Sequence, residues 1–181
     1  MCNHHHHRRF DRRRFLLAGA ATGLLAACGQ ASDGTKGVVA VEIDRSTSCA
    51  LDGMLLADYP GPKAQIHYAN RSEPDFFCDT VEMFHVHLNP EIVQPVRAMF
   101  VQDMGKADWD DPRGHWIDAR SAWYVHGSSR RGSMGPTLAS FADEAGARAF
   151  AQEFGGNVLR FDDVTADMVV LDGGALHDSR M

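Results

Sequence analysis

Two stretches of the chain repeat the same order of features, and this recurrence limits the fold more than any other part of the sequence. The first stretch has a turn at Gly53-Met54, a strand-like run, the Phe-x-Asp triplet at 77–79 and a short helical pattern. The second has a turn at Met134-Gly135, a strand-like run, the triplet at 141–143 and another short helical pattern. A ββα unit of this size buries too little apolar surface to be stable alone. We therefore predict an α+β fold in which two small pseudo-repeated ββα units pack together, with any ligand site at their junction.

Hydrophobic periodicity predicts the elements inside these units. Alternating or β-branched runs predict strands at 39–43, 64–69, 96–102, 121–127, 137–141 and 157–161. An apolar stripe from Phe77 to Leu88 predicts a first helix, with Asp79 or Thr80 as its N-cap. A second helix is predicted to follow Asp143, its N-cap, and to end before Gly155-Gly156.

The N-terminal residues have the parts of a lipoprotein signal peptide in the usual order. Arg12-Arg13 precedes Phe15-Leu16-Leu17, which fits a twin-arginine pattern, and the apolar run that follows is too short to span a bilayer. The run ends in Leu25-Ala26-Ala27-Cys28, which is similar to a bacterial lipobox. We predict that residues 1–27 are removed and that Cys28 receives lipid. The alternative is an ordinary signal peptide in which Cys28 is a chance residue.

This interpretation divides the chain into four parts and sets the charge of the mature protein. The parts are a signal peptide (1–27), a lipidated cysteine with a flexible tether (28–38), a first unit with the metal-binding loop (39–116) and a second unit with the C-terminal tail (117–181). The signal peptide contains five of the 18 basic and one of the 24 acidic residues, which leaves a net charge near −10. Such a surface repels nucleic acid and anionic headgroups, so we expect no nucleic-acid partner and membrane contact through the lipid on Cys28.

Signal-peptide removal and lipidation would leave two further cysteines, Cys49 and Cys78. In an oxidising compartment their default is one disulfide, which would make the protein a disulfide-stabilised structural or binding lipoprotein without metal. The other interpretation is that at least one of them is a metal thiolate. Cys78, whose counterpart in the second unit is Ala142, is predicted to be a small buried hydrophobic residue. We predict no enzyme, because Asp52 replaces the second cysteine of a C-x-x-C motif and no G-x-S-x-G or H-E-x-x-H motif occurs.

Several short motifs follow the lipobox in a specific order. They are C-x-x-x-G-M at 49–54, Y-V-x-G-S at 124–128, M-G-P at 134–136, F-A-D-E-x-x-A-x-x-F at 141–150 and G-G-x-V-L-x-F-D-D-V at 155–164. Their order and spacing resemble the NosL family, the copper-chaperone lipoproteins that serve nitrous-oxide reductase. The resemblance implies two similar ββα units, Cu(I) as cargo and a lipid-anchored position in the cell envelope, facing the periplasm. It also implies the assembly proteins of nitrous-oxide reductase as partners, namely a membrane transporter complex and periplasmic factors.

The loop that contains Cys49 and Met54 suits Cu(I) better than zinc. Cu(I) prefers thiolate and thioether sulfur, whereas zinc favours a closed set of four ligands, usually several Cys and His. Gly53 allows the sharp turn that lets both sulfurs converge. Family members often carry C-x-x-C-G-M, and this chain lacks that second thiol. We therefore predict a Cu(I) site of Cys49, Met54 and Met134, the last contributed by the second unit, with His126 as a further candidate ligand.

Overall fold

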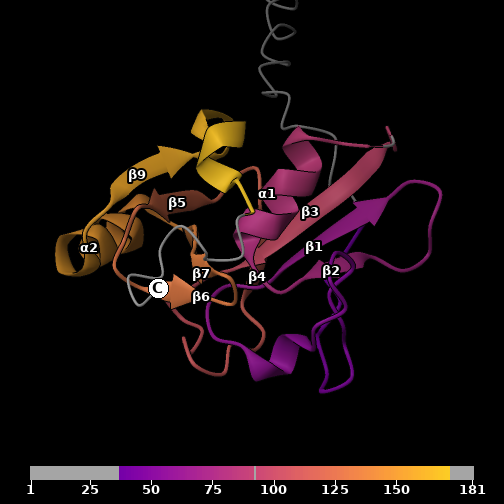
Figure 1. The fold of residues 1–181 in the computed structure, drawn as a ribbon, viewed down its shortest axis with the longest axis horizontal. Coiled ribbons are helices and arrows are strands. Elements are labelled where there is room, and N and C mark those ends of the chain that lie inside the picture. The colour runs from indigo at the N-terminus through magenta and orange to yellow at the C-terminus, as the bar shows by residue number, and fades with distance from the viewer. Residues whose placement is uncertain (1–36, 92, 172–181) are drawn as a thin grey trace, which may run out of the picture. The chain divides into compact units, whose positions relative to one another are not determined.

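An antiparallel four-stranded sheet and one helix form the first part of the fold. The computed structural model describes residues 37–91 and 93–171, so the predicted signal peptide, Cys28 and most of the tether lie outside the described residues. Strands β1 (Ala64–Tyr68), β2 (Asp75–Phe77), β3 (Val96–Gln102) and β4 (Trp116–Asp118) pair in the order β2-β1-β3-β4. Helix α1 (Thr80–Leu88) connects β2 to β3 and lies beside this sheet in Figure 1.

A smaller antiparallel sheet and a second helix form the later part. Strands β5 (Trp123–His126), β8 (Ala139–Phe141) and β9 (Asn157–Arg160) pair in the order β8-β5-β9, and helix α2 (Glu144–Phe154) contacts all three. A hairpin of β6 (Arg131–Gly132) and β7 (Gly135–Pro136) comes between β5 and β8. The short 3-10 helices are η1 (Leu56–Asp58), η2 (Phe161–Asp163) and η3 (Ala166–Val169).

One hydrophobic core is shared by the two parts. The ring of Phe84 on α1 lies against Tyr124 of β5 and Phe161 of η2, with ring centroids 5.0 Å apart in each pair. The same buried cluster includes Ile66 of β1 and Val169 of η3. A second, smaller cluster lies between α2 and its sheet. The structure confirms the predicted α+β class, and the pseudo-repeat of two ββα units stays a prediction.

Residues 39–43, predicted as a strand, adopt no strand in the structure. The backbone N–H of Val41 donates to Gln65 Oε1 and its carbonyl accepts from Gln65 Nε2, both over 2.9 Å. Gln65 belongs to β1, whose two edges are already paired with β2 and β3. With no free edge on β1, the backbone of Val41 is satisfied by a side-chain amide and not by a neighbouring strand.

Most of the other predicted elements are present. The remaining five predicted strands correspond to β1, β3, β5, β8 and β9, while the sequence patterns do not predict β2, β4 or the β6–β7 hairpin. Both helices begin at predicted caps: Asp79 Oδ1 accepts from the Val81 amide (3.0 Å), and Asp143 Oδ1 accepts from the Gly146 amide (2.8 Å). Phe77, predicted to lie in the first helix, is instead the last residue of β2. Strand β4 pairs with β3 and spans the predicted boundary between residues 116 and 117.

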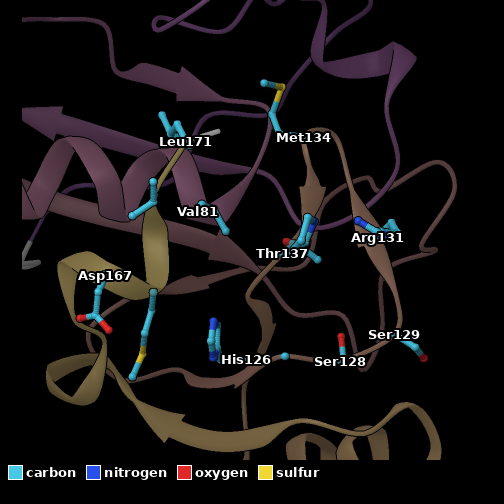
Figure 2. Close-up of a pocket in the computed structure, with 13 residues that line it drawn as sticks. Val81, His126, Ser128, Ser129, Arg131, Met134, Thr137, Asp167 and Leu171 are labelled. Carbon is cyan, nitrogen blue, oxygen red and sulfur yellow. The ribbon is translucent and has the colours of Figure 1, made fainter. Parts of the chain in front are cut away.

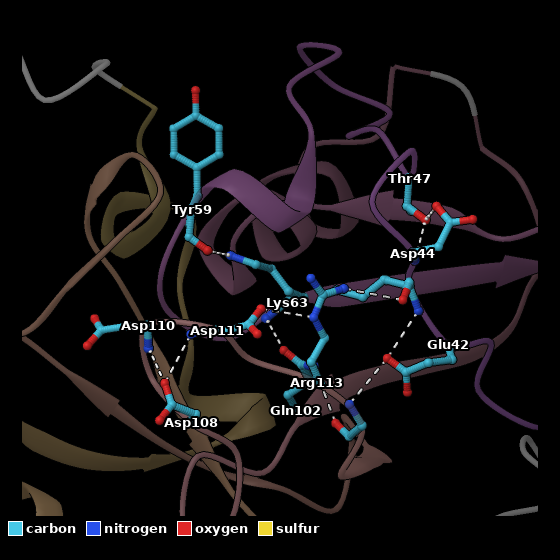
Figure 3. A network of polar contacts seen from close by, with 12 residues as sticks. Glu42, Asp44, Thr47, Tyr59, Lys63, Gln102, Asp108, Asp110, Asp111 and Arg113 are labelled. Carbon is cyan, nitrogen blue, oxygen red and sulfur yellow. Dashed lines mark hydrogen bonds and ion pairs between the residues drawn. The ribbon is translucent and has the colours of Figure 1, made fainter.

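A buried lysine connects the loop before β1 to the start of α1. The Lys63 ammonium donates to the carbonyls of Tyr59 (2.8 Å), Pro60 (3.0 Å) and Cys78 (3.0 Å). Figure 3 shows Lys63 beside Tyr59 and Gln102, and the Lys63 amide donates to Gln102 Oε1 over 3.0 Å. Burial lowers the pKa of Lys63. Because three carbonyls use all three ammonium protons, Lys63 fixes the backbone at Cys78.

A membrane-spanning helix must be both long and apolar. Within 37–91 and 93–171, no helix meets both requirements.

Candidate metal centre

The predicted metal-binding loop is a narrow turn closed by backbone hydrogen bonds. The Cys49 amide donates to the Met54 carbonyl (2.8 Å), and the Gly53 amide donates to the Cys49 carbonyl (3.0 Å). Gly53 has a φ of 77°, a left-handed conformation that favours glycine. Asp52 Oδ1 accepts from the Met54 amide over 3.0 Å, which stabilises the turn from its side chain. The turn therefore places Cys49 and Met54 opposite each other, with the exposed tip at 51–53 between them.

The Cys49 sulfur lies under this turn and against helix α1. Only 3% of the residue is exposed. Cys49 Sγ and Glu82 Oε2 share a hydrogen bond over 3.3 Å, and the Leu51 amide donates to the same sulfur over 3.4 Å. The Ala50 amide donates to the Phe76 carbonyl of β2 over 2.8 Å, which attaches the loop to the sheet. Cys49 is thus held at a defined place beside the first turn of α1.

Cys78 is the sequence neighbour of the N-cap and lies next to Cys49. The two sulfurs and a carboxylate oxygen of Asp52 all lie within 4.8 Å of one another. Cys78 is fully buried, as predicted, and both cysteines are free thiols in this structure. The sequence pattern predicts Cys78 only as a packing residue and does not reveal this proximity. No local sequence pattern indicates this proximity, because it depends on how the Cys49 loop packs against β2 and the start of α1.

The hydrogen bonds around this cluster favour a thiolate at Cys49. The hydrogen bond from Cys78, followed by backbone hydrogen bonds, lowers the pKa of Cys49 to about 6. Burial raises the pKa of Glu82 to about 9, and the hydrogen bond to Cys49 together with burial raises the pKa of Cys78. Burial also raises the pKa of Asp79 to about 6. The lowered pKa of Cys49 and the raised pKa of Glu82 both favour the thiolate, the form of cysteine that binds metal.

The other two predicted ligands lie around a pocket. Met134 is at the tip of the β6–β7 hairpin, and His126 is the last residue of β5. Both line a pocket of about 750 Å³ together with Met168 and Leu171. Figure 2 shows the Met134 thioether pointing away from the His126 ring. Among the described residues, the group of candidate ligand atoms within 4.8 Å contains Cys49, Asp52 and Cys78 and does not contain His126.

Asp79 connects the Met134 hairpin to the cysteine pair. Thr137, next to β7, donates from Oγ1 to Asp79 Oδ1 over 2.7 Å. A Cβ placed on Gly132 of β6 would lie only 2.0 Å from Asp79 Oδ2, so the hairpin backbone lies directly against this carboxyl group. Because Asp79 follows Cys78, the hairpin that carries Met134 is bound to the residue beside the second thiol. The structure thus places the Met134 hairpin near the cysteine cluster, and the four-residue ligand set stays a prediction.

Comparisons with known proteins identify the family of this chain. The sequence profile of the NosL family matches residues 40–169. The copper-binding lipoprotein NosL of Stutzerimonas stutzeri is 38% identical over 159 residues, which cover 85% of this chain and 83% of that protein. The protein of the same name from Achromobacter cycloclastes is 39% identical over 160 residues, or 86% of this chain and 82% of that protein.

A solved structure supports the same assignment. The crystal structure of the copper chaperone NosL from Shewanella denitrificans has 39% sequence identity and a TM-score of 0.68. The match covers 71% of this chain and 97% of that one. The family profile, two sequence relatives and this structure agree over most of the chain, which therefore belongs to the NosL family.

Proposed function

We propose that this protein binds Cu(I) through the Cys49 thiolate and delivers it to the maturation machinery of nitrous-oxide reductase. The observation that carries the proposal is the buried Cys49–Cys78 pair next to a short exposed turn. The names of the relatives, a copper-binding lipoprotein and a copper chaperone, support copper as the metal. In this proposal the protein is a carrier and not an enzyme, which the names copper-binding lipoprotein and copper chaperone support.

The chemistry of the cluster favours Cu(I) over Zn(II). A thiolate at Cys49 with nearby thiol and thioether sulfur is a soft donor set, which Cu(I) prefers. Within the group of Cys49, Asp52 and Cys78, the carboxylate of Asp52 is the hard donor, and it is exposed at the turn. Structural zinc sites usually have four ligands, mostly cysteine and histidine, and the described group offers only two sulfurs and one carboxylate. We therefore expect zinc to bind more weakly at the same place.

The proposed ligand set keeps Cys49 and Met54 from the first unit and Met134 from the second. His126 is a further candidate, and the position of Cys78 adds a second thiol to the candidates. The hydrogen bond between Thr137 and Asp79 supports the contribution of Met134, because it ties the Met134 hairpin to the start of α1. In this proposal the copper lies between two pseudo-repeated units, each of which supplies part of the site.

Release of the metal is favoured by the position of the turn. Residues 51–53 are exposed, while the Cys49 sulfur lies beneath them. A sulfur ligand of an acceptor protein that approaches this tip can share the copper with Cys49 before it displaces Met54. A site with few ligands permits such exchange, whereas a closed cage of four ligands would resist it.

The proposed location follows from the lipobox-like segment at Cys28 and from the lipoprotein names of the relatives. We propose that lipid on Cys28 anchors the protein in the cell envelope, with the folded part in the periplasm. Its partners there are the nitrous-oxide reductase assembly proteins, a membrane transporter complex and periplasmic factors.

A Cu(I) competition experiment tests the binding proposal. The lipid-bearing protein, extracted in detergent and reduced without oxygen, is titrated against a chromogenic Cu(I) chelator of known affinity. We expect one Cu(I) per chain and a clear preference over Zn(II). Cys49→Ser should lose at least about a hundredfold in affinity, since changing a group that merely orients a metal ligand already costs about 10–100-fold. Met104→Leu, far along the chain and packed in the second cluster, is the control. Preference for zinc, or unchanged affinity in Cys49→Ser, contradicts the proposal.

A further inference from the structure

We propose that Cys49 and Cys78 form a reversible disulfide, so that a disulfide-class oxidant closes the copper site and a thiol reductant opens it. The inference rests on the proposed function, because it treats Cys49 as the copper thiolate. It adds a modification site and the chemical class of its reactants. The observation behind it is that these two free thiols, from different elements, lie within 4.8 Å of one another.

The geometry permits the bond with a small local change. A disulfide has an S–S distance of about 2 Å, so the sulfurs must approach each other by no more than about 3 Å. Rotation about χ1 of a cysteine moves its sulfur by a comparable distance, because the staggered positions are well separated. The backbone on both sides is already fixed: the Cys49 amide is bonded to the Met54 carbonyl, and the Cys78 carbonyl accepts from Lys63. Rotation of the side chains can therefore bring the sulfurs together while these hydrogen bonds hold the loop and the start of α1.

The two thiols differ in how an external reagent can reach them. Cys49 belongs to the turn whose tip, residues 51–53, is exposed. Cys78 has no exposed surface and lies behind the turn, with its sulfur 3.7 Å from the Met54 carbonyl oxygen. An incoming disulfide therefore meets Cys49 first, and Cys78 is the resolving thiol.

The reaction conserves atoms and electrons in two steps. Cys49 attacks an external disulfide R–S–S–R, forming a mixed disulfide Cys49–S–S–R and releasing one R–SH. Cys78 then attacks the Cys49 sulfur, forming the Cys49–Cys78 disulfide and releasing the second R–SH. The protein loses two electrons and two protons, which reduce the oxidant to two thiols. The reverse reaction uses a dithiol or two monothiols.

The consequence for copper is mutual exclusion. A disulfide sulfur is neutral and no longer a thiolate, so the oxidised protein has lost its anionic ligand for Cu(I). Conversely, copper bound to the Cys49 sulfur occupies the atom that must attack the oxidant. The loaded protein is thereby protected, and the empty protein is the form that oxidises. In an oxidising compartment this prevents an empty carrier from remaining with a reactive thiolate beneath its exposed turn.

Thiol mass spectrometry tests the inference. The reduced, lipid-bearing protein is incubated with oxidised glutathione, and its intact mass and disulfide-linked peptides are followed with time. We expect the wild type to lose the mass of two hydrogen atoms, without a lasting glutathione adduct, and to yield a peptide pair joined at Cys49 and Cys78. Cys78→Ser should stop at the glutathione adduct on Cys49, and Cys49→Ser should form no adduct. Cys78→Ala replaces Cys78→Ser if circular dichroism shows that the serine variant is unfolded.

Measurements with and without bound Cu(I) separate this inference from the proposed function. We expect Cu(I) loading to slow disulfide formation at least about tenfold, because copper occupies the attacking thiolate. Oxidation should abolish Cu(I) binding, and a thiol reductant should restore it. If the reduced protein binds no Cu(I), the proposed function fails whatever the disulfide result. If it binds Cu(I) but keeps two free thiols, or holds a lasting glutathione adduct in the wild type, the disulfide inference alone is overturned.

Discussion

At the scale of single residues, the chemistry depends on which sulfurs meet the copper. In the proposed site Cys49 supplies the negative charge, while Met54 is partly buried against the core and Met134 lies at a hairpin tip. Met54→Leu and Met134→Leu keep side-chain volume nearly constant while removing the thioether. If the site is shared between the two units, each change should weaken Cu(I) binding by about tenfold or more. Each should also reduce the copper-induced rise in melting temperature, since stabilisation by a ligand follows its affinity.

The matched control for these two variants is Met104→Leu, which alters a methionine packed in the second core cluster. It should leave Cu(I) affinity and the copper-induced rise in melting temperature unchanged. If Met134→Leu behaves like this control while Met54→Leu does not, the copper site lies within the first unit alone.

Glu82 gives the empty protein a pH dependence of known sign. Burial raises its pKa to about 9 from an ordinary value of 4.5, so the folded state holds a proton that the unfolded chain releases. The free energy of unfolding contributed by Glu82 is therefore full below pH 4.5 and falls as pH rises toward 9. Glu82→Gln mimics the protonated carboxyl, so it should match the wild type near pH 4 and become the more stable protein at higher pH. Urea unfolding of the metal-free protein across this range measures the difference.

The contribution of Cys49 to the free energy of unfolding changes with pH in the opposite direction to that of Glu82. Its pKa falls from an ordinary value of 9 to about 6, so its contribution to stability is present above pH 9 and is lost as pH falls toward 6. The Glu82→Gln comparison is therefore repeated in a Cys49→Ser background, where the carboxyl titrates without the thiol. If the stability difference between the proteins with and without the Glu82→Gln change does not vary with pH, this carboxyl is ionised in the folded state.

At the scale of elements, the two helix caps make a direct comparison. Asp79 and Asp143 each cap one helix, but Asp79 is buried and also accepts from Thr137, whereas Asp143 is exposed. Asp143→Ala should cost about 1 kcal/mol, the usual effect of losing a cap. Asp79→Ala should cost about 3 kcal/mol, because it also leaves the buried Thr137 hydroxyl and Val81 amide without their acceptor.

Chemical unfolding of the metal-free variants measures both losses. Asp79→Asn, which keeps an acceptor oxygen, serves as the conservative variant and should lose less than Asp79→Ala. Equal losses for Asp79→Ala and Asp143→Ala would mean that the hydrogen bond to the β6–β7 hairpin contributes little to the fold.

The helix caps also show what sequence patterns can predict. Both caps and the strands β1 and β3 depend on neighbours in sequence, and their patterns predicted them well. The strand predicted at 39–43 is absent for a reason that lies elsewhere in the chain, because both edges of β1 are paired with β2 and β3. The closeness of Cys49 and Cys78 is equally non-local, since it follows from the Ala50–Phe76 and Lys63–Cys78 hydrogen bonds. Residue type therefore led to the prediction that Cys49 binds copper, and only the fold revealed the second thiol beside it.

At the scale of the whole molecule, the shared core makes the proposed copper site a property of the complete fold. Phe84, two residues after Glu82, packs against Tyr124 and Phe161 from the later part of the chain. Any change that separates the two parts would therefore shift α1, and with it the carboxyl beside Cys49. For this reason we expect copper binding and global unfolding to be coupled, so that a single transition moves to higher temperature when Cu(I) is added.

The attachment of the whole protein to the membrane is predicted to depend on lipid at Cys28. Cys28 lies outside the described residues, so the prediction rests on the lipobox-like segment and on the charge of the mature chain. A net charge near −10 gives the protein no electrostatic attraction to anionic headgroups, which leaves the lipid as the means of attachment. Washing membranes with concentrated salt should therefore release little protein, whereas detergent should release it. Cys28→Ser should move the protein into the soluble fraction, while Cys2→Ser, inside the predicted signal peptide, should leave it on the membrane. If Cys28→Ser protein stays on the membrane to the same extent as the wild type, lipidation at Cys28 is not the anchor.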